Sequence, residues 1–319
     1  MSESPMVDKR SEIVLLFDVI HGNPNGDPDA GNAPRVDPET GYGIVTDVCL
    51  KRKVRNFVAL TKEYKPPYDI YVKDRGILAN QQKRAYEALG AQPDAAGRAN
   101  EQARAWMCQT FFDVRTFGAV MTTGKTGEEE PANGAAKGKG TRKSQKLWNC
   151  GQVRGPVQFG FARSLAPVLS MEHTITRVAL TNPGDTDRAA AEAGDGEEKA
   201  GSGQMGRKHA IPYALYRAHG FVSPFLAKDT GFSQADFDVL LQSLEHLFDH
   251  DRSAARAEME VRGLYVFDHD SALGNAPAHK LFDLIRIDGP ATPRSFSDYA
   301  VAIPMESDMP VGVTLRRIV

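Results

Sequence analysis

Residues 22–41 read GNPNGDPDAGNAPRVDPETG and are dense in glycine, proline, asparagine and aspartate. Such a run cannot form a helix or a central strand, because proline removes N–H donors and glycine and asparagine favour left-handed backbone. It separates an apolar strand, EIVLLFDVI at 12–20, from a basic helix predicted at 46–62. A loop this long in a compact domain is usually functional or disordered, and its closely specified turn residues favour a shaped loop.

The composition is that of an ordinary soluble globular protein. The 319 residues are 41% hydrophobic and 25% charged, which suits one large domain with insertions, or two domains. No apolar run approaches the roughly 20 residues that span a bilayer, and the polar N-terminus lacks a secretory pattern. Cys49, Cys108 and Cys150 are scattered and odd in number, so no disulfide framework is expected. We therefore expect a cytoplasmic protein.

The net charge of −2 conceals a segregated charge distribution. The segment 46–62 carries five basic residues and one acid, and 124–146 carries six basic residues and three glutamates. The segment 181–200 has the opposite sign, with six acids and two bases. Segregation of this kind fits a local anion-binding surface on a nearly neutral protein, and it fits three solvated faces equally well.

The periodicity of apolar residues predicts the remaining elements. Ser233 begins a helix, because a capping serine there is followed three residues later by Asp236 and then by an apolar face. Further helices are expected at 81–89 and 98–112, and further strands at 113–121, 152–163, 172–180, 261–267 and 280–287.

Without its insertions, the predicted order is strand, helix, strand, strand, helix, strand. That order is typical of the ferredoxin-like arrangement of RRM modules. We therefore expect an α+β fold, with a single RRM-like domain over residues 1–319. The expected insertions are helical at 75–112, basic and mobile at 124–146, and acidic at 181–206.

The helix predicted at 46–62 is amphipathic. Its core face is apolar: Leu50, Val54, Phe57 and Val58. Lys51, Arg55 and Lys62 form a row at its flank, with Arg52 just beyond. Such a row can track a phosphate backbone, although a solvated helix face has the same pattern. The adjacent loop, rich in free backbone N–H groups, favours anion binding because such loops cradle anions.

The segment RGPVQFGF at 154–161 compares with the signature octapeptide of RRM modules. Arg154, Gly155 and Phe161 fit that signature, but the stacking aromatic residues are missing from their usual places. The comparison therefore favours nucleic acid only weakly, and an ordinary core strand is the alternative.

Three other motifs fail. GAVMTTGKT at 118–126 has one residue too many between its glycines for a phosphate-binding P-loop. The aspartates of 22–41 do not keep the spacing of a calcium loop. His246 and His250 lie one helical turn apart but lack a third zinc ligand. No small-ligand, metal or cofactor site is predicted.

A family resemblance begins at 17–58, FDVIHGNPNGDPDAGNAPRVDPETGYGIVTDVCLKRKVRNFV. This stretch closely resembles the crRNA-binding backbone subunit of type I-C CRISPR surveillance complexes (Cascade). The stretch at 205–227, MGRKHAIPYALYRAHGFVSPFLA, is similar to the same family, and the resemblance runs through essentially the whole chain. It implies an RRM-like palm, a helical insertion and a thumb-like protrusion, which we expect at about 181–210.

The resemblance implies a protein that is not an enzyme and needs no cofactor. Copies of it stack head to tail into a helical filament along one guide RNA, and the guide pairs with target DNA in antiviral interference. The implied partners are crRNA, the target DNA strand, further copies of the chain and other Cascade subunits.

The resemblance also implies a set of RNA-binding residues. Lys51, Arg52 and Arg55 match the family's contacts to the RNA backbone, and Met205 is placed to wedge against a displaced base. The complete set expected to bind RNA is Asn23, Asn25, Arg35, Lys51, Arg52, Arg55, Arg154, Met205, Arg207 and Lys208.

Two other classes of function stay open. Related backbone subunits cut target RNA with a metal-dependent aspartate in the first long loop, where this chain has Asp27, Asp29 and Asp37. These residues also suit turns, since aspartate–proline pairs favour them. A purely structural filament protein that needs no nucleic acid would equally explain the segregated charges.

Overall fold

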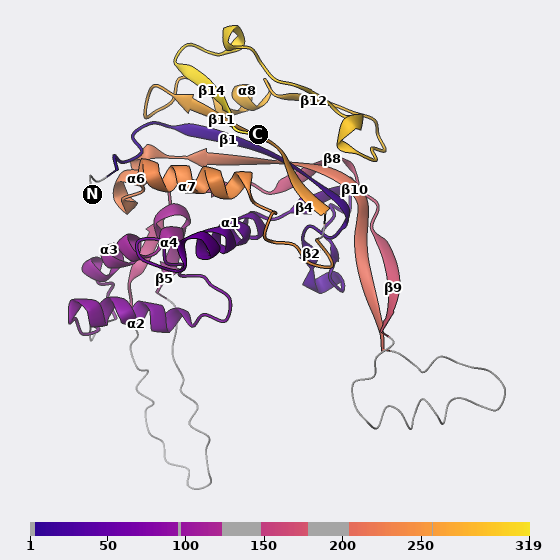
Figure 1. The fold of residues 1–319 in the computed structure, drawn as a ribbon. Helices are drawn as coiled ribbons and strands as arrows, with labels where there is room; N and C mark the ends of the chain where they lie inside the picture. The colour runs from indigo at the N-terminus through magenta and orange to yellow at the C-terminus, as the bar shows by residue number, and fades with distance from the viewer. Residues whose placement is uncertain (1–3, 95–96, 123–147, 178–203, 257) are drawn as a thin grey trace, which may run out of the picture.

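A computed structural model describes residues 4–94, 97–122, 148–177, 204–256 and 258–319. The expected basic loop at 124–146, the acidic run at 185–198 and most of the expected thumb therefore lie outside the described residues. Mixed helices and strands surround one large sheet (Figure 1), which confirms the predicted α+β class. In the part of the chain that is described, no helix is both long and apolar enough to cross a membrane.

Eight strands form one antiparallel sheet in the order β14-β11-β1-β10-β8-β4, and β7 and β9 also pair with β10. In chain order these strands are β1 (Ser11–Gly22), β4 (Tyr42–Val45), β7 (Val157–Phe159), β8 (Ala162–Pro167), β9 (Met171–Arg177), β10 (Gln204–Val222), β11 (Glu258–His269) and β14 (Val313–Arg317). Three short strand pairs lie outside it: β2 (Gly26–Asp27) with β3 (Ala33–Pro34), β5 (Gly118–Met121) with β6 (Gly151–Arg154), and β12 (Arg286–Asp288) with β13 (Ala300–Ala302).

Helices connect these strands. They are α1 (Asp47–Lys62), α2 (Leu78–Leu89), α3 (Glu101–Thr110), α4 (Phe112–Phe117), α6 (Pro224–Thr230), α7 (Gln234–Glu245) and α8 (Ala278–Phe282), with short 3-10 turns η1 (Pro28–Ala30), η2 (Phe296–Asp298) and η3 (Glu306–Asp308). Helices α1 and α7 begin as predicted. The Thr46 hydroxyl accepts a bond from the Cys49 N–H, and Ser233 and Asp236 form a reciprocal capping box.

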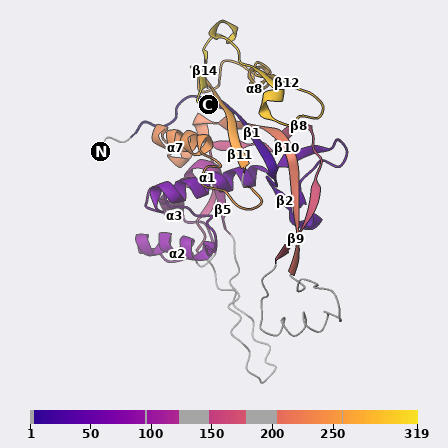
Figure 2. The same ribbon diagram turned by 45° about the vertical axis from the view of Figure 1, so that its right-hand side comes forward.

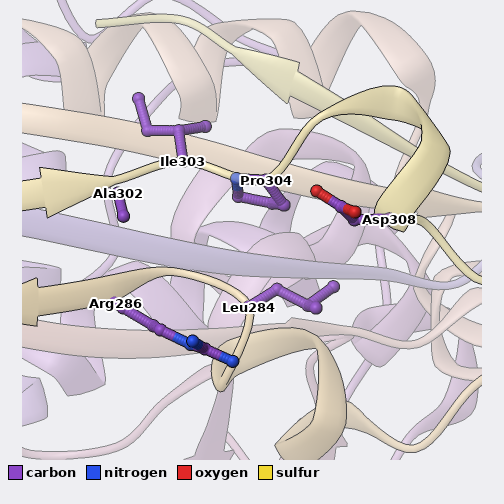
Figure 3. Close-up of a pocket in the computed structure, with 6 residues that line it drawn as sticks. All are labelled: Leu284, Arg286, Ala302, Ile303, Pro304 and Asp308. Carbon is purple, nitrogen blue, oxygen red and sulfur yellow. The ribbon is translucent and has the colours of Figure 1, made fainter.

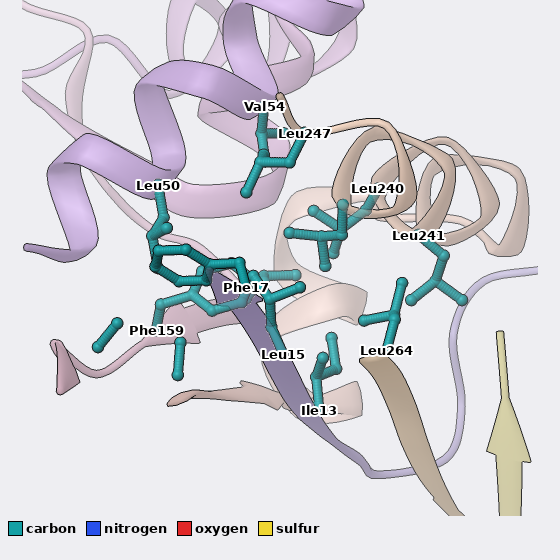
Figure 4. Packing of buried hydrophobic residues seen from close by; sticks show 14 of the residues in the cluster. Ile13, Leu15, Phe17, Leu50, Val54, Phe159, Leu240, Leu241, Leu247 and Leu264 are labelled. Carbon is teal, nitrogen blue, oxygen red and sulfur yellow. The ribbon is translucent and has the colours of Figure 1, made fainter. Parts of the chain in front are cut away.

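The central strand β1 is buried on both faces, which explains its uninterrupted apolar run. Ile13, Leu15 and Phe17 pack under α1 and α7 (Figure 4). Val14 and Leu16 pack on the opposite face against α8 and the segment around β12 and β13. The C-terminal segment therefore covers the sheet face that α1 and α7 leave free (Figure 1).

Two predicted strands are wrong in part. Of the strand predicted at 113–121, residues 113–117 belong to helix α4, and only 118–121 form a strand. The β-branched and aromatic residues there favour a strand locally, but tertiary contacts override that preference. Arg115 in α4 forms a buried, two-pronged ion pair with Asp236 at 2.7 and 2.9 Å, which fixes the helix against α7.

The region predicted as a strand at 280–287 contains the end of α8, and only 286–288 form a strand. Arg217 stabilises the end of α8, because its guanidinium donates hydrogen bonds to the carbonyls of Phe282 and Ile285. The strand predicted at 152–163 is divided into β6, β7 and the start of β8, since Pro156 lacks an N–H for the ladder. By contrast, the strand predicted at 261–267 is confirmed within β11.

Candidate nucleic-acid interface

The loop at 22–41 is held against the start of α1. The Asn25 Oδ1 atom accepts hydrogen bonds from both the backbone N–H and the hydroxyl of Thr46, each at 2.9 Å. Across the loop, the Asn23 side-chain amide donates to the Asn32 carbonyl at 2.7 Å. These bonds confirm the prediction of a shaped loop. They also give Asn23 and Asn25 structural roles, and the Oδ1 atom of Asn23 is buried with no hydrogen-bond partner among the described residues.

The first acids of the loop are engaged with the loop itself. The Asp27 Oδ1 atom accepts from the Asp29 N–H at 3.2 Å and lies 3.4 Å from Arg35 Nη1. Asp27 thus caps the short turn η1. Arg35, expected to bind RNA, is half-buried and already faces this carboxylate.

Asp37 is engaged at the end of the loop. It pairs with Arg163 of β8 at 2.6 Å and accepts from the Glu39 N–H at 3.1 Å. A hydrogen bond from the Thr40 side chain, supported by these contacts, lowers the pKa of Asp37. No group of three or more histidine, cysteine, aspartate or glutamate side chains able to hold a metal ion occurs among the residues that the structure describes.

The predicted cations of α1 differ in accessibility. Lys51 bonds Asp47 at 3.0 Å and Gln158 at 3.1 Å, and only 12% of its side chain is exposed. Arg55 bonds the buried Asp113 at 2.8 Å and is 13% exposed. Arg52 is exposed and forms no ion pair or hydrogen bond with another described residue. Among Lys51, Arg52 and Arg55, Arg52 is therefore the described cation that is most available to a ligand.

A ring of Phe117 lies under the two shielded cations. The Lys51 ammonium lies 5.6 Å from the ring centroid and the Arg55 guanidinium 5.4 Å from it. Cation–π contacts of this kind hold both side chains beside the helix. The two cations contribute positive potential at this edge of the molecule rather than free donors.

The octapeptide at 154–161 has a structural explanation. Phe159 is buried in the core, whereas Phe161 is 58% exposed. A Cβ on Gly155 would overlap the backbone of Phe117 and Gly118, so close packing requires glycine there. Arg154 is exposed on β6, outside the main sheet.

The described base of the expected thumb is a two-stranded hairpin formed by β9 and the start of β10. It projects away from the sheet in both views (Figures 1 and 2). Arg207 is exposed and its Nε atom lies 3.2 Å from Glu172. Lys208 lies opposite His173, and the backbone of Met205 lies opposite Thr176. The hairpin therefore carries these three residues away from the cations of α1.

Comparison with protein families decides the family of this chain. The model of the family described as "CRISPR-associated protein Cas7" matches residues 9–304 of this chain. The chain belongs to the Cas7 family. The CRISPR-associated protein Cas7 of Haloferax volcanii is 30% identical over 234 residues, which are 72% of this chain and 62% of that protein. The matched region thus spans less than two-thirds of that Cas7 protein.

Two solved structures are more distantly similar. A chain from a "CRISPR RNA-guided surveillance complex, pre-nicking" has a TM-score of 0.45 and 16% identity, with 81% of this chain and 78% of that chain covered. A chain from the type III-B Cmr-beta complex bound to cognate target RNA has a TM-score of 0.37 and 10% identity, with 81% and 61% covered. At these values neither similarity bears on the site of this Cas7-family protein.

Sequence reasoning missed a second basic element of the interface. The segment DRSAAR at 251–256, between α7 and β11, lies against α1 in this Cas7-family chain. Lys53, which the helical pattern left out of the site, is buried and forms an ion pair with Asp251. Two arginines in six residues are the sole sequence signal, and nothing in that spacing points to a helix some 200 residues earlier in the chain.

A hollow of about 490 Å³ lies on the opposite side of the sheet (Figure 3). It is lined by Leu284, Arg286, Ala302, Ile303, Pro304 and Asp308. One arginine and one aspartate among small and apolar side chains form no convergent polar cluster, so we place no site there.

Proposed function

We propose that this Cas7-family protein is a crRNA-binding backbone subunit of a type I-C CRISPR surveillance complex. The observation that carries the proposal is the exposed Arg52 of α1, which pairs with no described residue, on a helix whose start is fixed to the glycine- and asparagine-rich loop. Arginine donors next to such a loop suit the phosphates of a polyanion. In the proposed function, this polyanion is the single-stranded RNA of an assembled surveillance complex.

The binding is proposed to be largely independent of guide sequence. Phosphate contacts carry no base information, whereas contacts to 2′-hydroxyl groups distinguish RNA from DNA. Arg52 supplies a direct donor, while Lys51 and Arg55 raise the local positive potential from partly shielded positions. Asn23 and Asn25 hold the loop in its conformation beside the proposed RNA strand.

We propose that the fold is an RRM-like palm with insertions. The strand order β11-β1-β10-β8, with α1 following β1 and α7 preceding β11, supports this assignment because it matches the ferredoxin-like order. The helical insertion contains α2 and α3, and the thumb grows from the hairpin of β9 and β10. Copies of the palm stack along one guide, bind other Cascade subunits and support pairing of the guide with target DNA.

We propose that the chain is not an enzyme. The contacts of the loop acids support this: Asp27 caps a turn and faces Arg35, and Asp37 pairs with Arg163. The alternative is a metal-dependent endoribonuclease that uses a loop aspartate. The assembled complex, incubated with RNA complementary to its guide, is expected to leave that RNA intact with Mg²⁺ or with EDTA. Regularly spaced cuts that EDTA abolishes would favour the alternative.

The proposal is tested by co-expression with a guide transcript. The purified protein is expected to carry the guide, seen as a raised ratio of absorbance at 260 nm to that at 280 nm, and to form helical particles in electron micrographs. Filaments free of RNA would instead favour a purely structural protein.

A further inference from the structure

The segment 251–256, which we call the connector, joins α1 to the glycine- and asparagine-rich loop. Asp251 forms an ion pair with the buried Lys53 of α1. At the other end, the Ala255 carbonyl accepts a hydrogen bond from the Asn23 N–H at 2.7 Å. The connector therefore borders the same surface as the loop and α1, although it lies far from both in sequence.

Arg256, at the end of the connector, has guanidinium donors that bond no other described residue. Its Nε atom is buried 3.3 Å from Asp251 Oδ2 but forms no hydrogen bond. The side chain as a whole is 37% exposed, and its other nitrogens bond no described residue. Asp251 thus fixes the base of the guanidinium, while the amino groups remain available to an anion.

Arg256 and Arg52 lie near the same carboxylate. The Asn56 side-chain amide donates to Asp251 Oδ1 at 3.4 Å, and Asn56 lies one helical turn after Arg52 on α1, so the two side chains are neighbours. Cys49 and Arg52 lie three residues apart on α1 and so share a face. Burial raises the pKa of the Cys49 thiol, and the charges of Lys53, Arg256 and Arg52 oppose that effect. The Cys49 Sγ atom itself lies 3.6 Å from the Pro24 carbonyl of the loop.

The charges where the connector meets α1 do not balance. Lys53, Arg256 and Arg52 are three cations. Among the described residues, Asp251 is the one carboxylate in contact with any of them, so two positive charges remain. Arg252, also in the connector, is paired with Glu260 at 2.9 Å and adds nothing to this excess. Two exposed arginines with an unbalanced charge match one phosphate group, which accepts several guanidinium hydrogen bonds.

We propose that Arg256 and Arg52 together bind one phosphate of the guide RNA, and that Asp251 is a positioning residue that aims Arg256 at it. This inference rests on the proposed function. It adds the connector to the interface and gives Arg52 a specific partner in binding.

The pair is tested by a double-mutant cycle. The affinity of the full chain for a fluorescent single-stranded RNA is measured for wild type, Arg52→Ala, Arg256→Ala and the double variant, with Arg252→Ala as a matched control. Each single variant is expected to bind roughly tenfold more weakly. The double variant should lose little more, because both arginines serve one phosphate. Losses that multiply, or an Arg256→Ala variant that binds like wild type, overturn the inference.

Asp251→Asn separates positioning from net charge. Removal of an acid makes the site more positive, so a purely electrostatic effect would strengthen RNA binding. The inference predicts weaker binding, with thermal unfolding followed on the same sample to show a folded protein. Unchanged or stronger binding by the folded variant contradicts it. If wild type itself binds no RNA, the proposed function fails. If wild type binds RNA and the Arg256→Ala variant binds it equally well, the inference alone fails.

Discussion

At the scale of single residues, one amide oxygen fixes the loop on which the interface depends. The Asn25 Oδ1 atom accepts two hydrogen bonds from Thr46, and the Thr46 hydroxyl in turn caps α1. Sequence reasoning expects Asn25 to bind RNA, which stays a prediction, but it does not predict these bonds to Thr46. A pattern of turn residues cannot reveal which side chain satisfies which backbone group, since that depends on the folded loop.

Asn25→Ala is expected to destabilise the protein by about 1–2 kcal/mol, because it leaves the Thr46 N–H and hydroxyl without their acceptor. Urea unfolding followed by circular dichroism measures this change. Glu39→Ala, in the exposed end of the same loop, is the control and should change stability less. A free energy of unfolding equal to that of wild type would show that the loop is held by other contacts.

At the scale of elements, the local sequence pattern predicts the helices and strands whose buried residues recur at a regular spacing. The run at 12–20 and the capped helices α1 and α7 are of this kind. The sequence pattern does not predict β10 as a strand. Most of its side chains in the main sheet are buried on both faces, and Pro212 and Gly220 interrupt the run. The pattern predicts strands over parts of α4 and α8, because partners distant in sequence decide the conformation of these two segments.

The contact between β10 and α8 gives a pH-dependent prediction. His219 stacks on Phe282 at 4.0 Å, and its Nε2 atom accepts a bond from Arg217. Burial, with the nearby Arg217 charge, lowers the pKa of His219 to about 4. The unfolded chain therefore binds the extra proton between about pH 6.5 and pH 4. Stability contributed by neutral His219 is present above this window and is lost as the pH falls through it.

His219→Gln removes this titration but keeps an acceptor for Arg217. Between pH 7 and about pH 4.5, wild type is expected to lose roughly 1–2 kcal/mol more stability than the variant, after allowance for solvent screening. Urea titrations at each pH, compared as differences, isolate this group from the carboxylates. Parallel stability profiles for the two proteins would mean that His219 is not held neutral by its neighbours.

At the scale of the whole molecule, the C-terminal segment limits where the candidate interface can lie. It covers one face of the sheet, and α1 and α7 cover the other (Figure 1). The candidate interface is therefore an edge formed by α1, the loop at 22–41 and the connector. The sequence predicts the first two, since they are neighbours in the chain. It could not predict the connector, which reaches the site only through the folding of α7 and β11.

The most direct test of the account is the salt dependence of RNA binding. Lys51, Arg52 and Arg55 are replaced together by glutamine, which keeps hydrogen-bonding groups beside Asp113 and Gln158. Arg286→Ala, an exposed arginine on the opposite side of the sheet, is the control. The slope of log affinity against log salt is expected to fall by roughly 0.7, because Arg52 supplies the one direct phosphate contact of the three. The affinity should fall further, because the positive potential of Lys51 and Arg55 is lost as well. A folded triple variant with the affinity and slope of wild type would contradict the assignment of this edge to RNA.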